Sequence, residues 1–238
     1  MNVLVACEYS GIVRDAFENK GWNAWSCDLL PTESEQTKLS GKHIQGDILK
    51  IIKGSHSGIE VYDYAQTMIE LNKWDLLIAF PPCTYLSYVF MGERRYEPAR
   101  LQKTTDAIKF FIELWNAPIE HICLENPVGV IQHVLPYSQI IQPYFWGKET
   151  GEDYTKRTCL WLKNLPKLEY NKDNNLFNKA TYIKPTKVFY NAGGANRRGN
   201  SVLSGFANGS ERSKFHKGIA NAMAEQWTEY LTNLKLRK

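Results

Sequence analysis

WDLLIAFPPCTY, residues 74–85, is the stretch that decides the fold. Its first seven residues form the most apolar run of the chain, and Pro81 and Pro82 end that run. Proline has a fixed φ and no backbone N–H, so it cannot continue a central strand. We therefore predict a buried β-strand over 74–80, followed by a rigid turn that presents Cys83.

Strand-like and helix-like segments alternate around this strand. Short apolar runs that read as strands lie at 3–7, 22–30, 43–48 and 121–126. Apolar residues with helical spacing lie at 12–21, 59–72 and 98–116. Helices that alternate with strands in this way are typical of βαβ units with parallel strands. The pattern predicts an α/β fold with a doubly wound, mostly parallel, Rossmann-like sheet, and 238 residues suffice for one core.

The chain changes character after about residue 137. The pieces QPYFWG, RTCLWL, TYI and KVFY look β-like, while residues 191–210 are rich in Gly, Asn and Ser and predict a loop. Residues 214–234 have the apolar stripe of an amphipathic helix. We expect one domain made of 1–162 and 214–238, with a small irregular insertion at 163–213.

The composition excludes few functions. A net charge of +4 permits a polyanionic partner without requiring one. No apolar run approaches the roughly 20 residues that span a bilayer, and the first residues enter a strand directly, with no leader pattern. Five cysteines without a CxxC pair argue against a disulfide framework or a zinc site. We expect a cytoplasmic protein with free thiols, no metal and no membrane contact.

Polar residues follow the predicted strands where each strand ends: Glu8, Asp28, Asp47, Cys83 and Glu125. Ligands of open α/β sheets bind outside the carboxyl ends of the strands. These five residues come from different parts of the chain, and the topology brings them to one edge. The sequence therefore predicts a functional site at that edge.

The first turn, EYSGIV (residues 8–13), indicates the type of cofactor. It has a single glycine, whereas a dinucleotide needs further glycines so that the backbone can approach a pyrophosphate. The turn thus favours S-adenosylmethionine over NAD. Asp28 suits the two hydroxyls of a ribose, and Asp47 suits the adenine amino group. The alternative is that each acid only caps the helix that follows it.

Cys83 and Glu125 carry the chemistry. A thiolate can add to carbon 6 of a pyrimidine and so turn carbon 5 into a nucleophile. Cys83 needs activation by a helix N-terminus or a basic group. A buried Glu125 is costly when ionised, so it is suited to stay protonated and donate to ring nitrogen 3, while Asn126 orients the loop. The alternatives are a packing cysteine and a salt-bridged glutamate.

The order VACEYSG, CDL, GDI, FPPC, LENP resembles the motif series of the cytosine-5 DNA methyltransferases. The resemblance implies the class I fold that binds S-adenosylmethionine, with Cys83 as the nucleophile and Glu125 on the base. It also implies the residues that line the cofactor, namely Glu8, Tyr9, Ser10, Gly11, Asp28, Asp47 and Pro81.

Two later segments extend the resemblance. YTKRTCLWL is similar to the basic motif of the family that contacts the cytosine carbonyl and a phosphate, a role for Arg157 or Lys156. KGIANAMAEQW is similar to the closing Gly-Asn-Ala helix, which implies that Asn221 lies near the cofactor. Residues 163–213 then correspond to a short target-recognition region.

These observations lead to one hypothesis and several alternatives. The hypothesis is a DNA cytosine-5 methyltransferase, as in restriction–modification, that extrudes its base from the duplex. Arg94, Arg95 and Arg100 lie where the family has a loop that closes over that base, and Arg197 and Arg198 suit phosphate contact. The alternatives are modification of RNA or a free pyrimidine nucleotide, a non-catalytic protein that binds cofactor or nucleic acid, and amino-group methylation, which Phe80 before the prolines disfavours.

Overall fold

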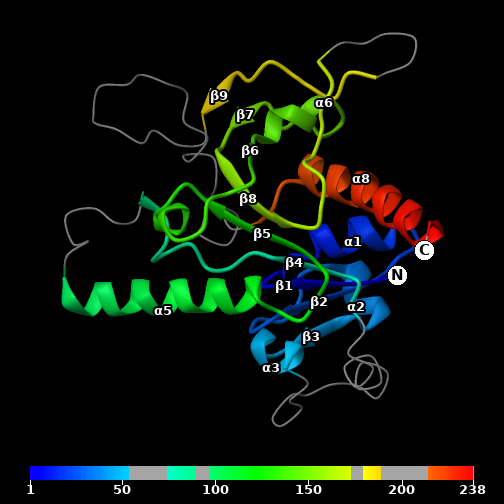
Figure 1. Ribbon diagram of the computed structural model, residues 1–238. Helices are drawn as coiled ribbons and strands as arrows, with labels where there is room; N and C mark the ends of the chain where they lie inside the picture. The colour runs from blue at the N-terminus through cyan, green and yellow to red at the C-terminus, as the bar shows by residue number, and fades with distance from the viewer. Residues whose placement is uncertain (54–73, 89–96, 173–178, 189–213, 238) are drawn as a thin grey trace.

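A seven-stranded sheet forms the centre of the molecule in the computed structural model, which describes residues 1–53, 74–88, 97–172, 179–188 and 214–237 (Figure 1). The strands lie in the order β3-β2-β1-β4-β5-β8-β6. Their bounds are β1 Asn2–Ala6, β2 Asn23–Asp28, β3 His43–Gln45, β4 Leu76–Ala79, β5 His121–Pro127, β6 Gln139–Ile141 and β8 Thr158–Lys163. The helix expected at 59–72, the loop at 191–210 and the arginines 94, 95, 197 and 198 lie outside the described residues.

The topology confirms the predicted fold class. Strands β3, β2, β1, β4 and β5 pair in parallel, in the order of the first five strands of a Rossmann sheet. Strand β8, which is the predicted RTCLWL strand, is antiparallel to β5 and to β6. The sheet is therefore doubly wound and mostly parallel, with one reversed strand near an edge.

Helices cover both faces of the sheet. Helices α1 (Ile12–Glu18) and α8 (Lys217–Leu236) pack on one face, and α3 (Ile48–Ile52) and α5 (Pro98–Trp115) pack on the other (Figure 1). Side chains alternate accordingly along β1: Val3 and Val5 pack in the core under α1 and α8, and Leu4 packs in the core under α3 and α5. Since both faces are buried, the strands read as continuous apolar runs.

Some local predictions were wrong. QPYFWG is not a strand: Pro143–Trp146 forms the 3-10 helix η4, and Gly147–Thr150 forms helix α6. Proline suits a first helical position because its missing N–H has no partner there. Strand β3 ends at Gln45, and Asp47 begins α3. The polar stretch after β2 contains helix α2 (Glu35–Ser40), capped by Ser34, whose hydroxyl accepts from the Thr37 N–H at 3.1 Å.

The second half of the chain adds smaller elements. Strand β7 (Tyr154–Thr155) pairs in parallel with β9 (Lys187–Val188), and Val130–His133 forms the 3-10 helix η3. Part of the expected target-recognition region packs on α8, because Leu168 is buried in the core that α8 shares. The division into 1–162 plus 214–238 and 163–213 stays a prediction. Within the described part of the chain, no helix is both long and apolar enough to cross a bilayer.

Candidate active site at the carboxyl ends of the strands

Cys83 follows β4 at the edge of the sheet where the parallel strands end. Directly after β4, the N–H of Phe80 still donates to the Ala6 carbonyl of the neighbouring strand β1, at 3.0 Å. The carbonyl of Cys83 accepts from the N–H groups of Leu86 at 3.0 Å and Ser87 at 2.9 Å. Cys83 thus begins a helical turn, and its side chain is half-buried. The turn fixes the direction of the thiol.

The end of β5 holds this turn in place. The buried Asn126 side chain donates from Nδ2 to the Pro81 carbonyl at 2.7 Å. Farther on, the N–H of Val130 donates to the Leu86 carbonyl at 2.9 Å. At Gly129 the backbones approach so closely that a Cβ would lie 1.9 Å from the Leu86 carbonyl oxygen. The segments that carry Cys83 and Glu125 therefore form one rigid unit.

Glu125 lies near the Cys83 thiol and has an acid strength suited to proton donation. Burial raises its pKa from 4.5 to about 7, although Lys156 acts in the opposite direction. The raised pKa favours the protonated carboxyl, which is the form that its expected role uses. Burial and the charge of Glu125 raise the pKa of Cys83, while Lys156 lowers it. Thiol, carboxyl and ammonium thus interact at one point.

Lys156, rather than Arg157, provides the basic group of this cluster. The charge of Lys156 acts on the pKa of both Cys83 and Glu125. Arg157 is exposed, and its charge lowers the pKa of Cys159 instead. Of the two residues that the basic motif offered, the electrostatics favour Lys156.

Glu8 caps helix α1, as the alternative held. Its Oε1 accepts from the N–H of Val13 at 2.6 Å, and its Oε2 accepts from the N–H of Arg14 at 3.2 Å. The side chain is buried, and burial raises its pKa to about 7 despite these bonds. Gly11 begins the helix with φ +74°, and a Cβ there would lie 2.4 Å from the Cβ of Ser34. Both residues shape the first turn.

Asp28 and Asp47 meet beside Cys7. Asp28 is half-buried, with Oδ1 accepting from the Leu30 N–H at 2.9 Å, whereas Asp47 is exposed and caps α3 through the Leu49 N–H at 2.9 Å. Burial, followed by the charges of these two acids, raises the pKa of the Cys7 thiol to about 12. The structure therefore brings the ends of β1, β2 and β3 together, as predicted.

This edge has the chemistry that an adenosine moiety needs. Next to the Asp28 carboxylate lie two apolar side chains that face solvent, Leu29 at 72% exposure and Leu30 at 54%. The residues present therefore fit S-adenosylmethionine, whose ribose and adenine would lie against Asp28 and these leucines.

The structure also locates the remaining predicted residues. Pro81 is buried beneath the Cys83 turn. Tyr9 and Ser10 are half-buried in the first turn, where the Tyr9 carbonyl accepts from the Glu33 N–H at 2.8 Å. Asn221 is exposed on α8. No ligand contact distinguishes their roles, which stay predictions. Sequence reasoning did not name Leu29 and Leu30 as candidate site residues, although their position directly after Asp28 was a usable signal.

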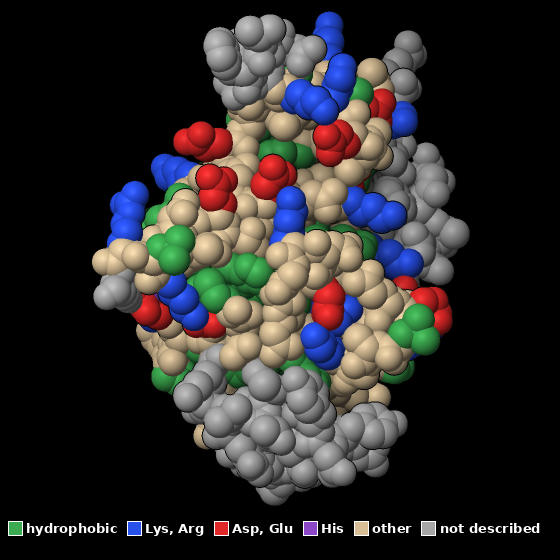
Figure 2. Space-filling view, turned by 90° about the vertical axis from the view of Figure 1, so that its right-hand side faces the viewer, with side chains coloured by type: hydrophobic (Ala, Val, Ile, Leu, Met, Phe, Trp, Pro, Cys, Tyr) green, Lys and Arg blue, Asp and Glu red, His purple; other side chains and the backbone are tan. Residues whose placement is uncertain are grey.

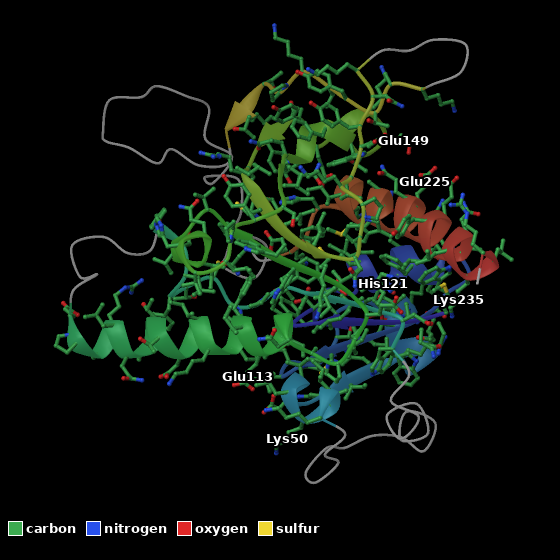
Figure 3. The ribbon with its side chains drawn as sticks, in the orientation of Figure 1. Lys50, Glu113, His121, Glu149, Glu225 and Lys235 are labelled. Atoms are coloured by element: carbon green, nitrogen blue, oxygen red, sulfur yellow. The ribbon has the colours of Figure 1, made fainter. Side chains whose placement is uncertain are left out.

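A hollow lies at the amino ends of the strands, opposite the Cys83 turn, and Figure 2 views the molecule from the side on which both termini lie in Figure 1. It has a volume of about 170 Å³ and is lined by residues of the strand starts and of α8, among them His121 and Lys235, which Figure 3 labels. Its polar groups bond to one another: Lys235 Nζ lies 2.9 Å from Asp75 Oδ1, and the His121 ring lies 3.1 Å from the Asp75 carbonyl. Such pairing is structural, and this end is not where open sheets bind ligands.

Comparisons with known proteins give matches among solved structures. No family model matches the chain, and no curated protein matches it. Among solved structures, the chain is similar to the methyltransferase EhMeth of Entamoeba histolytica, with 15% sequence identity and a TM-score of 0.43. The match covers 77% of this chain and 57% of that one, so the chain spans little more than half the length of EhMeth. At this identity and score the likeness carries no argument about activity.

Proposed function

We propose that the chain is an S-adenosylmethionine-dependent methyltransferase that acts on carbon 5 of cytosine in DNA through a covalent bond from Cys83. The convergence of Cys83, Glu125 and Lys156 carries this proposal. A thiol, a carboxyl with a pKa raised to about 7 and a half-buried lysine are the groups that the addition requires. The motif series, the Rossmann-like topology and the edge at Asp28 also support it.

The residues divide the reaction between them. The Cys83 thiolate, stabilised by Lys156, forms a bond to carbon 6 of the cytosine. The electron pair of the 5,6 double bond moves into the ring, and protonated Glu125 supplies a proton to nitrogen 3. When bound, S-adenosylmethionine supplies a methyl group on a positively charged sulfur. Once carbon 5 carries the methyl group, its proton passes to solvent water, and the re-formed 5,6 double bond expels the thiolate from carbon 6. Nitrogen 3 returns its proton to Glu125.

Lys156 offsets the unfavourable position of the thiol. Burial and the neighbouring Glu125 oppose ionisation of Cys83, so the free protein holds a protonated thiol at neutral pH. Protonation of Glu125 removes its negative charge and so part of this opposition. The positive charge of Lys156 lowers the pKa of the thiol further. The thiolate is therefore expected to form when the base is in place and nitrogen 3 can share the proton of Glu125.

The test is covalent capture. Duplex DNA that contains 5-fluorocytosine, incubated with S-adenosylmethionine, is expected to give a protein–DNA adduct that survives denaturation, because fluorine cannot leave as the proton does. Cys83→Ser is expected to abolish the adduct, and Cys123→Ala, in the core, is expected to keep it. Parallel reactions with RNA, nucleotides and tritiated cofactor identify the substrate. Label on adenine amino groups, or full turnover by Cys83→Ser, would exclude the mechanism.

A further inference from the structure

The segment that carries Lys156 is tied to the N-terminus of α8. Glu152, four residues earlier, accepts from the Lys217 N–H through Oε1 at 3.0 Å and from the Gly218 N–H through Oε2 at 2.8 Å. A carboxylate is favourable at a helix N-terminus, where N–H groups lack intrahelical partners. A Cβ at Gly218 would lie 2.7 Å from the Trp146 carbonyl oxygen, so glycine permits this close approach.

A second bond joins the same two segments. The Tyr154 hydroxyl lies 2.8 Å from Nδ1 of His216, and Glu152 Oε1 lies 3.8 Å from the same nitrogen. His216 is 3% exposed, and burial together with the charge of Lys156 keeps its pKa well below the ordinary value. Burial and the acids Glu152 and Asp153 raise the pKa of Tyr154. A neutral imidazole and a protonated phenol therefore form a bond that does not change with pH near neutrality.

Lys156 lies between this bond and the Cys83 cluster. Its charge lowers the pKa of His216, while the charges of Glu125, Cys83 and Glu152 raise the pKa of Lys156 itself. The same helix end also contacts the Cys83 loop: the ring of Phe215 lies 4.6 Å from the ring of Phe80, which directly precedes Pro81. The start of α8 thus holds both the basic residue and the loop of the nucleophile.

We propose that Tyr154, His216 and Glu152 form an anchor that positions Lys156 against Cys83 and Glu125. These three are positioning residues, because they act through Lys156. The purpose of the anchor rests on the proposed function. Its effect on Cys83 exists in the free protein, so it is measurable without any substrate.

The experiment follows the reactivity of Cys83. The purified protein is treated with iodoacetamide, an uncharged reagent, between pH 6.5 and 10.5, and modification of Cys83 is quantified by peptide mass spectrometry. Among the described residues, Glu125 and Lys156 face Cys83, and Glu152 and Lys156 face His216. Glu152 also acts on Lys156 itself. Loss of one nearby opposite charge shifts a pKa by about 1–3 units, so Lys156→Met is expected to slow alkylation at pH 8 by about tenfold or more.

Tyr154→Phe removes one hydroxyl and is expected to slow alkylation at pH 8 by about threefold, since Lys156 is then displaced but present. The matched control is Tyr144→Phe, a tyrosine packed on Tyr182 away from the cluster, which is expected to leave the profile unchanged. Glu152→Gln tests the bonds of Glu152 to the start of α8 and is expected to move the profile in the same direction.

The outcomes separate the two proposals. A profile unchanged in Tyr154→Phe and Glu152→Gln, with a shift in Lys156→Met, would overturn the anchor. A profile unchanged in Lys156→Met would overturn it as well, because Lys156 would then not act on the thiol. If the anchor variants shift the profile but no adduct with 5-fluorocytosine forms, the anchor stands and the cytosine chemistry fails.

Discussion

Replacing Glu125 by glutamine tests whether this side chain is an acid held near neutrality at a cost to stability. Its pKa rises from 4.5 to about 7 on folding, mainly because the site is buried. At 1.36 kcal/mol per pKa unit, this corresponds to an upper limit of about 3 kcal/mol. Between these two values the folded state binds the proton more tightly than the unfolded chain does. The cost is therefore absent below pH 4.5 and complete above about pH 7.

The variant Glu125→Gln stays neutral, so it escapes this cost. Its free energy of unfolding is expected to exceed that of the natural chain by up to about 3 kcal/mol at pH 8, and to match it near pH 4.5. Urea unfolding at several pH values measures both. Glu8→Gln is the control, since Glu8 has a similar pKa of about 7 but accepts two backbone N–H bonds, one of which glutamine loses. We expect a smaller gain there.

One result would refute this reasoning. If Glu125→Gln loses stability at pH 8 and pH 4.5 alike, the carboxylate is a paired structural group, as the salt-bridge alternative held. A gain at pH 8 together with loss of the DNA adduct would instead show that the natural chain keeps an acid that destabilises it, which is the behaviour of functional sites.

Three further predictions concern the rigid unit and the cofactor edge. Gly129→Ala places a Cβ against the Leu86 carbonyl and is expected to lower stability by at least about 1–3 kcal/mol, and an unchanged thermal midpoint would contradict the tight contact. Asn126→Ala removes the bond to Pro81 and is expected to cost about 1–2 kcal/mol in urea unfolding and to reduce adduct formation, so full adduct yield would show that the bond does not position Cys83. Asp28→Asn is expected to weaken S-adenosylmethionine binding about tenfold by calorimetry, since a charge-assisted hydrogen bond contributes about 1.5–3 kcal/mol, and unchanged affinity would remove Asp28 from the site.

The sequence was sufficient for the five parallel strands that begin the central sheet. Strands buried on both faces read as unbroken apolar runs, and β1, β4 and β5 were predicted to within two residues at each end. Capping signals were underused: Ser34 and Asp47 each begin a helix that the apolar pattern alone does not reveal. QPYFWG misled because aromatic residues favour strands, whereas here they pack under α8 from a helical turn begun by Pro143.

The candidate site was predictable to the extent that strand ends coincide with polar residues. Cys83, Glu125, Asp28 and Asp47 follow strands that periodicity identifies, and parallel pairing brings them together. The partner of the thiol could not be found in the same way. It comes from the reversed strand β8, and the position of a strand in a sheet depends on long-range pairing that local sequence does not specify.

The choice between Lys156 and Arg157 also needed the structure. Both are basic, and a motif resemblance cannot separate neighbours that differ by one residue. In the structure the charge of Lys156 acts on Glu125 and Cys83, whereas that of the exposed Arg157 acts on Cys159. Lysine also differs from arginine in kind, because burial lowers its pKa, whereas a guanidinium stays charged. Its charge beside Cys83 therefore depends on what holds it there, which is why the bonds of Glu152 and Tyr154 to α8 belong to the chemistry of the site as well as to its fold.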